Sequence, residues 1–190
     1  MILLTTSRRP TRNVRAFCRD LSHVIPGTLR VNRGKLSKMG VAGKALELKA
    51  EKVAIIDRWK GGPGKIQLFR VAGEEGLKLI PPIIYLRSVT LRREIPGAII
   101  KGRRIKSIAI EEPPNTTSNM EKFKNACSEF FEIPIISQSE VLEGKYDASM
   151  KIFTDNAGYL IVTFILLPEK IETGPRMKIS HLIWETNHAG

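Results

Sequence analysis

The sequence contains little cysteine and few aromatic residues. Its 190 residues include 2 cysteines, and Phe, Trp and Tyr together make up 6%. Cys18 and Cys127 are too few for a disulfide scaffold, and no cysteine–histidine group has the spacing of a zinc site. Each cysteine falls on or beside an apolar helix face and is expected in the core. We therefore predict neither a metal nor a cofactor.

Long apolar runs are also missing. No stretch approaches the ~20 apolar residues that a membrane helix needs. The longest run, Tyr159 to Leu167, is interrupted by Thr163 and is typical of a buried strand. The first residues do not have the layout of a signal peptide, because the charges follow the apolar stretch. With 42% hydrophobic residues, enough for a core, we predict a soluble intracellular protein with no membrane partner.

Acidic residues are scarce in the first part of the chain. Residues 1–106 hold 24 Lys and Arg against 7 Asp and Glu, whereas residues 107–190 hold 7 against 12. The formal charge of +12 therefore divides into +17 and −5. Such asymmetry indicates a polyanionic partner for the basic half, most commonly a nucleic acid, since Lys and Arg displace counterions from phosphates. A generically basic surface is the alternative.

Apolar periodicity predicts alternating strands and helices, and hence an α/β or α+β class. In the first half, Val14, Phe17, Leu21 and Val24 form one apolar stripe of a helix that Pro26-Gly27 ends. The other segments expected there are strands at 2–6, 28–31, 53–59 and 66–71, a helix at 37–50, a tight loop at 61–64, and extended structure at 77–91 broken by Pro81-Pro82.

The second half shows the same kinds of signal. A strand is expected at 105–110 and a helix from Ser118 to about Glu132, opened by a capping box between Ser118 and Glu121. Residues 149–154 and 159–167 flank a turn and predict a hairpin. A last strand is expected at 179–184.

A shift of 106 residues superimposes parts of the two halves without a gap. The stripe of the first helix then falls on Met120, Phe123, Cys127 and Phe130, and residues 53–56 fall on 159–162. This suggests two similar strand–helix halves packed side by side. Chance periodicity is the alternative. The shift places Arg12 on Ser118 and Arg15 on Glu121, so the architecture does not require these arginines.

The first helix carries a row of arginines opposite its apolar stripe. At ~100° per residue, Arg12, Arg15 and Arg19 share one face, and Arg8 and Arg9 are expected to extend the row into the preceding loop. Cations are unfavourable near a helix N-terminus, and no acidic residue precedes Asp20. A bound phosphate would resolve this conflict. An ordinary solvated face is the alternative.

Further basic residues could enlarge this surface, and no catalytic group stands out. The predicted RNA-binding set is Ser7, Arg8, Arg9, Arg12, Arg15, Arg19, Arg30, Arg33, Lys35, Lys60 and Lys65, with Arg103 and Arg104 as possible additions. The segment GGPGK at 61–65 lacks the spacing of a phosphate-binding loop. Nothing in the sequence indicates an enzyme, and no RNP-type aromatic pattern predicts a stacking platform.

The segment TTSRRPT at 5–11 resembles the Brix domain family of ribosome-biogenesis proteins, in its short archaeal stand-alone form. IPG at 25–27, NRGK at 32–35 and the GGPGK hairpin match as well. The resemblance implies a single Brix domain over 1–190, made of two halves similar to the anticodon-binding domain of class II aminoacyl-tRNA synthetases. It also implies an archaeal cytoplasmic protein.

Together these observations predict a non-enzymatic factor that binds precursor rRNA through its basic half and assists rRNA processing and subunit assembly. Ribosomal or assembly-factor proteins could contact the less basic half. The alternatives are a protein-interaction scaffold in the pre-ribosome with incidental RNA contact, and an RNA-processing enzyme, which would need a carboxylate cluster or a metal site.

Overall fold

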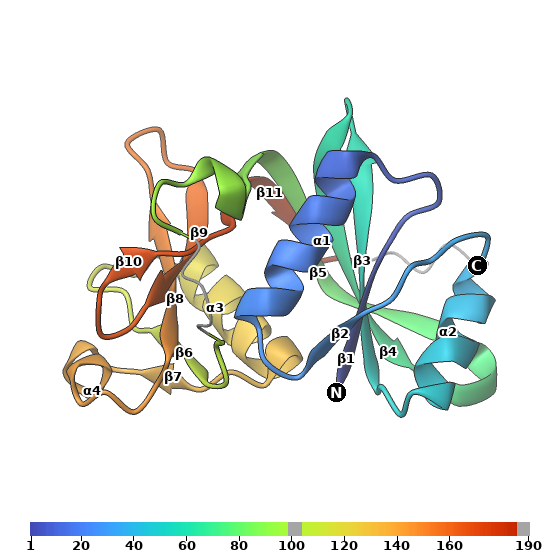
Figure 1. The fold of residues 1–190 in the computed structure, drawn as a ribbon, viewed down its shortest axis with the longest axis horizontal. Coiled ribbons are helices and arrows are strands. Elements are labelled where there is room, and N and C mark those ends of the chain that lie inside the picture. The colour runs from blue at the N-terminus through green and yellow to red at the C-terminus, as the bar shows by residue number, and fades with distance from the viewer. Residues whose placement is uncertain (99–103, 186–190) are drawn as a thin grey trace.

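The computed structural model describes residues 1–98 and 104–185 (Figure 1). Over these residues the chain forms one mixed sheet of 11 strands with four α-helices. The helices are α1 (Arg12–Val24), α2 (Lys38–Glu47), α3 (Ser118–Phe131) and α4 (Gln138–Leu142). The strands are β1 (Ile2–Thr6), β2 (Thr28–Arg30), β3 (Lys52–Trp59), β4 (Gly62–Val71), β5 (Leu77–Thr90), β6 (Ile108–Glu111), β7 (Ile135–Ile136), β8 (Ala148–Thr154), β9 (Leu160–Leu166), β10 (Ile171–Glu172) and β11 (Arg176–Ile183).

The order of the strands shows two halves of the same design. It runs β2-β1-β3-β4-β5 in the first half and continues β11-β9-β8-β6-β7 in the second, with β10 beside β9. In each half the first three strands are parallel and the later strands are antiparallel, and β5 and β11 join the halves as an antiparallel pair. The predicted α/β class and the two similar strand–helix halves, side by side in Figure 1, are confirmed.

The repeat has a different register from the one that the sequence suggests. The shift of 106 residues correctly superimposes β1 on β6 and α1 on α3. It is wrong for residues 53–56, because Leu4 of β1 pairs with Ala54 of β3, whereas the equivalent Ile110 of β6 pairs with Met150 of β8. Strand β3 therefore corresponds to β8 and not to β9. The connection is shorter in the second half, where α4 has 5 residues and α2 has 10.

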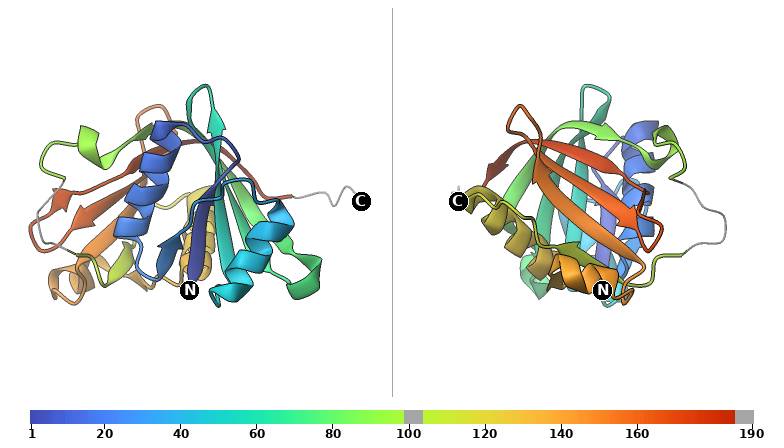
Figure 2. Two further views of the ribbon diagram at one scale, coloured as in Figure 1. Left: turned by 45° about the vertical axis from the view of Figure 1, so that its right-hand side comes forward. Right: turned by 90° about the vertical axis from the view of Figure 1, so that its left-hand side faces the viewer.

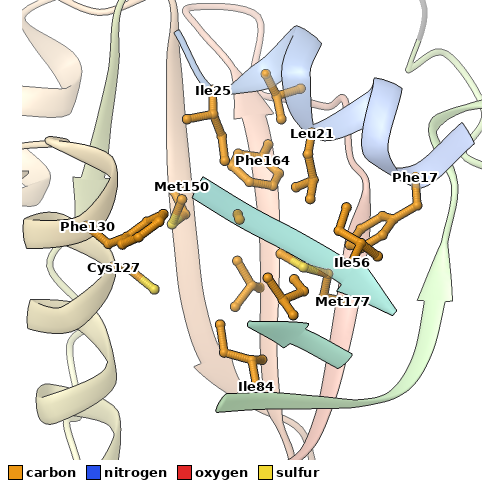
Figure 3. Close-up of a cluster of buried hydrophobic side chains, with 14 of the residues drawn as sticks. Phe17, Leu21, Ile25, Ile56, Ile84, Cys127, Phe130, Met150, Phe164 and Met177 are labelled. Atoms are coloured by element: carbon orange, nitrogen blue, oxygen red, sulfur yellow. The ribbon is translucent and has the colours of Figure 1, made fainter. Parts of the chain in front are cut away.

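One large core lies on the face of the sheet that α1 and α3 cover, called here the inner face. Phe17 and Leu21 of α1 belong to one buried cluster with Met150 and Phe164 of the second half, and Phe130 of α3 is part of the same cluster (Figure 3). The two cysteines are buried and free, as predicted for core residues. Burial raises the pKa of the Cys127 thiol to about 12. Because residues of both halves belong to this cluster, the two halves share one apolar core.

Helix α2 covers the opposite face of the first half, called here the outer face. Figure 2 shows α1 and α2 on opposite sides of the first-half strands. Leu3 and Val53 point toward α2, while their neighbours Leu4 and Ala54 point into the main core. Strands β1 and β3 are buried on both faces, which explains their continuous apolar runs in the sequence.

Three sequence predictions of local structure are wrong. Strand β5 is not broken at Pro81-Pro82, because the prolines lie at an irregularity in its pairing with β4, where a missing amide hydrogen is tolerated. Strand β6 begins at Ile108 and not at residue 105. The tight loop lies at Lys60 and Gly61, while Gly62 to Gly64 belong to β4.

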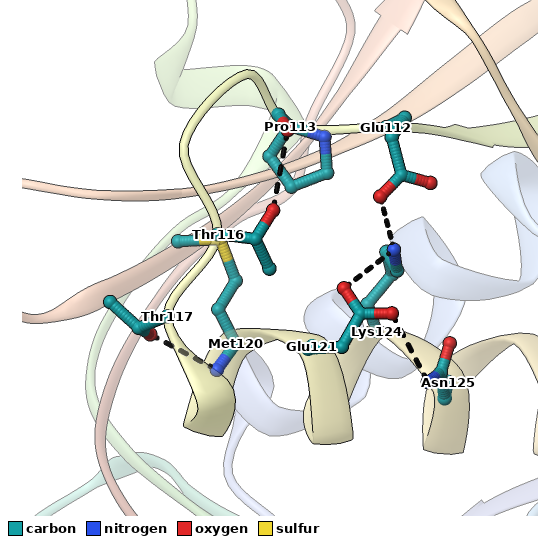
Figure 4. A network of polar contacts seen from close by, with 8 residues as sticks. All are labelled: Glu112, Pro113, Thr116, Thr117, Met120, Glu121, Lys124 and Asn125. Carbon is teal, nitrogen blue, oxygen red and sulfur yellow. Dashed lines mark hydrogen bonds and ion pairs between the residues drawn. The ribbon is translucent and has the colours of Figure 1, made fainter.

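The prediction of a capping box between Ser118 and Glu121 at the start of α3 is also wrong. Thr117, one residue before Ser118, caps the helix and accepts a hydrogen bond from the Met120 amide at 3.3 Å. Glu121 turns instead toward Lys124 (Figure 4). Thr117 lies 106 residues after Thr11, which caps α1, so the two helices begin at equivalent positions.

Candidate nucleic-acid interface

The exposed side of α1 carries the predicted arginines. Arg12, Arg15 and Arg19 are exposed, while Val14 and Phe17 on the other side are fully buried. The first turn of this 13-residue helix holds no acidic residue. The predicted amphipathic helix is confirmed, with its guanidinium groups near the positive end of the helix dipole, where an anion is favoured.

The loop before α1 is fixed to its surroundings by hydrogen bonds. The Thr11 hydroxyl accepts from the Val14 amide and donates to the carbonyl of Gly61 at 2.7 Å. The Arg15 guanidinium donates to the Pro10 carbonyl at 2.9 Å, so it lies back over this loop. Arg9 has a φ of 56°, in the left-handed region that non-glycine residues rarely adopt. The chain thus makes a sharp, braced turn from β1 into α1.

The tip of the β3–β4 hairpin lies next to this loop through the bond between Thr11 and Gly61. Lys60 and Gly61 both have positive φ, as a two-residue type I′ turn requires. Trp59, just before the turn, is 69% exposed. The predicted RNA-binding set does not include Trp59. Its place beside the turn residues Lys60 and Gly61 was the available signal, because a ring at a hairpin tip has no core to enter.

Arg8 does not continue the α1 row. Its guanidinium donates to the Leu36 carbonyl at 3.4 Å, and Arg33 donates to the same carbonyl at 3.0 Å. These residues line an open groove of about 540 Å³ on the outer face, together with Ser7, Lys38, Asp57 and Arg58. The predicted single arginine row is therefore two basic surfaces, because the side chains before and after the Arg9 turn lie on opposite faces of the sheet.

Electrostatic coupling within this groove appears in the pKa of Arg33. Burial lowers that pKa, the charge of Arg8 lowers it further, and Asp57 opposes both. The Ser7 hydroxyl is buried and has no hydrogen-bond partner among the described residues. The groove holds four cations, Arg8, Arg33, Lys38 and Arg58, of which Lys38 and Arg58 were missing from the predicted set.

The remaining predicted residues are dispersed. Arg30 and Lys35 are exposed, and Lys65 pairs with Asp57 at 3.5 Å on the outer face. Burial raises the pKa of the Cys18 thiol to about 12, and Arg30 is close enough to oppose that rise. Arg104 is exposed, whereas Arg103 lies outside the described residues.

Two arginines that the sequence analysis missed lie beside α1. Arg93 donates to the Asn13 side chain at 3.0 Å. The Arg92 amide donates to the buried carboxylate of Asp20 at 3.0 Å, and its guanidinium contacts the Thr173 carbonyl at 3.1 Å. Burial lowers the pKa of Arg92, against the influence of Asp20. Both come from a short 3₁₀ turn at Arg92–Glu94, whose position beside α1 depends on the tertiary fold.

The equivalent helix of the second half, α3, pairs a lysine with carboxylates. Lys124 is almost fully buried and forms ion pairs with Glu112 and Glu121 (Figure 4). Burial alone would lower the pKa of Lys124, but the two carboxylates outweigh this effect and raise it. Lys122 lies 4.3 Å from the centre of the Trp184 ring. Helix α3 thus buries Lys124 between two carboxylates, whereas α1 exposes its arginines.

Metal-ligating side chains do not cluster in the described part of the chain. Over residues 1–98 and 104–185, no group of three or more His, Cys, Asp or Glu side chains could hold a metal ion. None of the described helices is both long and apolar enough to cross a membrane.

The relatives found by comparison with known proteins share one description. A probable Brix domain-containing ribosomal biogenesis protein of Pyrococcus horikoshii is 40% identical over 95 residues, which are 50% of this chain and 42% of that protein. A protein of the same description from Pyrobaculum aerophilum is 26% identical over 160 residues, covering 84% of this chain and 83% of that one. The chain spans about half the length of the first relatives that it matches, 42% to 55%. No family model matches the chain.

The fold has a counterpart among solved structures. The crystal structure of a probable ribosomal biogenesis protein from Aeropyrum pernix superimposes with a TM-score of 0.79 at 25% identity. The match covers 96% of this chain and 98% of that one. Similarity in three dimensions therefore extends over both halves, including the second half, whose sequence carries few recognisable motifs.

Proposed function

We propose that this chain, which is similar to proteins described as probable Brix domain-containing ribosomal biogenesis proteins, is a member of that family and a non-enzymatic RNA-binding factor of ribosome biogenesis. It binds precursor rRNA through the basic first half and assists rRNA processing and subunit assembly in the cytoplasm. Ribosomal or assembly-factor proteins contact the less basic second half. The descriptions of the relatives support a role in ribosome biogenesis, and the excess of Lys and Arg in the first half supports RNA as the ligand.

The exposed arginine face of α1 is the observation that carries this proposal. Three guanidinium groups, those of Arg12, Arg15 and Arg19, lie along one helix whose first turn offers no carboxylate to pair with them. Phosphates supply that missing charge and accept hydrogen bonds from arginine in a forked geometry. The N-terminal amides of α1 add further donors for an anion.

These contacts explain binding and orientation more than recognition of a base sequence. Structured RNA presents a regular array of phosphates and 2′-hydroxyls, which proteins recognise largely through shape. Arg92 and Arg93 extend the cationic area beside α1, and the outer-face groove of Arg8 and Arg33 lies across the sheet. RNA that follows the Ser7–Thr11 turn could contact both surfaces.

A titration of fragments of the organism's rRNA against the protein at several salt concentrations tests the proposal. Each lost phosphate contact should flatten the dependence of log affinity on log salt by ~0.7 to 0.9. We expect the double variant Arg12→Glu with Arg15→Glu to weaken binding by about tenfold or more and to reduce the salt slope.

The matched control is Lys122→Glu with Lys145→Glu, which changes the net charge equally in the second half. Both lysines are exposed there. We expect this control to retain most of the affinity. If the control and the α1 variant weaken binding equally, the net charge rather than the α1 face attracts RNA, and the assigned surface is wrong.

A further inference from the structure

A row of polar and aromatic side chains crosses the outer face beyond the area that α2 covers. Residues paired directly across neighbouring strands share a face of the sheet. The register pairs Asp57 of β3 with Lys65 of β4, Lys65 with Tyr85 of β5, and Tyr85 with His181 of β11. At ~4.8 Å between strands, this row spans roughly 14 Å, and Asp57 continues it into the groove of Arg8 and Arg33.

Two rings in this row form a stack that is open to solvent. The Tyr85 and His181 ring centres are 4.4 Å apart with an angle of 11° between the planes. The Ser180 hydroxyl donates to the Tyr85 carbonyl at 3.2 Å and lies 3.0 Å from Nδ1 of His181, so it holds the imidazole in place. His181 is exposed and Tyr85 is half-buried. A flat, oriented ring is therefore available at the surface.

The strands that carry the two stacked rings, β5 and β11, also carry cations that lie against a third ring, that of Tyr159. Arg87, two residues after Tyr85 on β5, lies 4.9 Å from the centre of the Tyr159 ring. Lys178 of β11 lies 4.6 Å from the same ring. Asp155 pairs with Lys178 at 2.5 Å, and Asp57 pairs with Lys65 at 3.5 Å, so both acidic residues near the stack already have cationic partners.

We propose that this part of the outer face binds a short run of unpaired RNA, with a base stacked on His181 and phosphates beside Lys65, Arg87 and Lys178. The inference rests on the proposed RNA-binding function and adds the class of RNA that this face accepts. Single-stranded RNA is the occupant because it offers flat bases for the rings and phosphates for the cations in one ligand. An apolar protein surface would offer no acceptor to Arg87, which lies against the Tyr159 ring.

The arrangement explains how a stacking platform can exist without an RNP-type sequence pattern. Its rings come from strands β5 and β11 and from Tyr159 just before β9, which lie far apart in the chain. Only the pairing of β5 with β11, at the junction of the two halves, brings Tyr85 and His181 together. Neither half would form this platform alone.

Fluorescence anisotropy with a labelled oligoadenylate of about ten nucleotides, free and in a fully paired duplex, tests the inference. We expect His181→Ala to weaken single-strand binding by about 5- to 150-fold, as loss of one stacked base predicts, and to leave duplex binding unchanged. The salt slope should stay the same because the imidazole contacts no phosphate. Phe153→Ala is the matched control, since Phe153 is another exposed aromatic residue at 43% exposure, and it should bind like the wild type.

Photocrosslinking with RNA that contains 4-thiouridine gives a second readout that does not depend on a variant. The crosslinked peptide should contain Tyr85 or His181. Wild-type affinity in His181→Ala, an equal loss for duplex, or crosslinks confined to other peptides would overturn the inference. If Arg12→Glu with Arg15→Glu abolishes rRNA binding while His181→Ala changes nothing, the proposed function stands and this face is not part of it. If the wild type binds neither rRNA nor the oligoadenylate, both proposals fail.

Discussion

Helices α1 and α3 occupy equivalent places in the two halves, but their exposed surfaces differ in charge. Each begins after a capping threonine, and each buries an apolar stripe in the common core. Yet α1 exposes Arg12 and Arg15, while α3 has Ser118 and Glu121 at the same positions. The fold needs only the buried stripe, so the exposed face is free to serve a ligand in one half and to be neutral in the other.

The largest expected effect tests whether the two helices are structurally equivalent. Phe17→Ala in α1 and Phe123→Ala in α3 each remove a ring that is at most 2% exposed. Each should lower the free energy of unfolding by about 3–5 kcal/mol, because a cavity remains in the shared core. Urea denaturation measures both values. A cost below about 1 kcal/mol for either variant would contradict a common core that depends on both helices.

A smaller loss of stability is expected at a buried position where the two helices carry different residues. Position 18 of α1 is a buried cysteine, and the equivalent position in α3 is Lys124 with its two carboxylates. Lys124→Ala should cost about 1–3 kcal/mol, because Glu112 and Glu121 then face each other without a cation. Lys124→Met should cost less, since it fills the same space.

The contribution of the Lys124 ion pairs to stability should depend on pH. The hydrogen bond with Lys124 lowers the pKa of Glu121 below its ordinary value. A carboxylate with a lowered pKa stabilises the fold above its ordinary pKa and loses that contribution as the pH falls through the lowered value. Acidification should therefore destabilise the wild type more than Lys124→Met. Urea midpoints at neutral and acidic pH check this, and parallel pH profiles would contradict it.

The smallest effect concerns the two helix caps. Thr117→Ala removes only the bond from the Met120 amide and should cost about 1 kcal/mol. Thr11→Ala also removes the bond to Gly61 of the hairpin, so its cost should be about 1 kcal/mol greater. Thermal unfolding of the two variants measures this difference. Equal costs would indicate that the Thr11–Gly61 contact does not hold the hairpin against α1.

The sequence allowed the fold class, the two halves and most elements to be predicted, because apolar periodicity directly reflects burial. Its errors lie where local patterns compete. Thr117 and Ser118 are adjacent candidates for one cap, and in the structure Thr117 caps the helix while Glu121 pairs with Lys124. Elements with little periodicity, such as α4 and the two-residue β7, were not predicted.

The candidate site was predictable only where it lies on one element. The spacing of Arg12, Arg15 and Arg19 fixes their common face on α1. It could not show that Arg8 lies on the other face of the sheet, because the Arg9 turn separates them. Nor could it bring Arg93 beside Asn13, a contact between residues 80 positions apart.

The central claim is that the exposed arginines of α1, and not the shared architecture, make the first half bind RNA. The most direct test gives α1 the residues of α3, Arg12→Ser with Arg15→Glu, and measures rRNA-fragment affinity across a salt series. The slope of log affinity against log salt should become shallower by roughly 1.4 to 1.8, as for two lost phosphate contacts, while stability stays near that of the wild type. An unchanged slope and affinity would contradict the account.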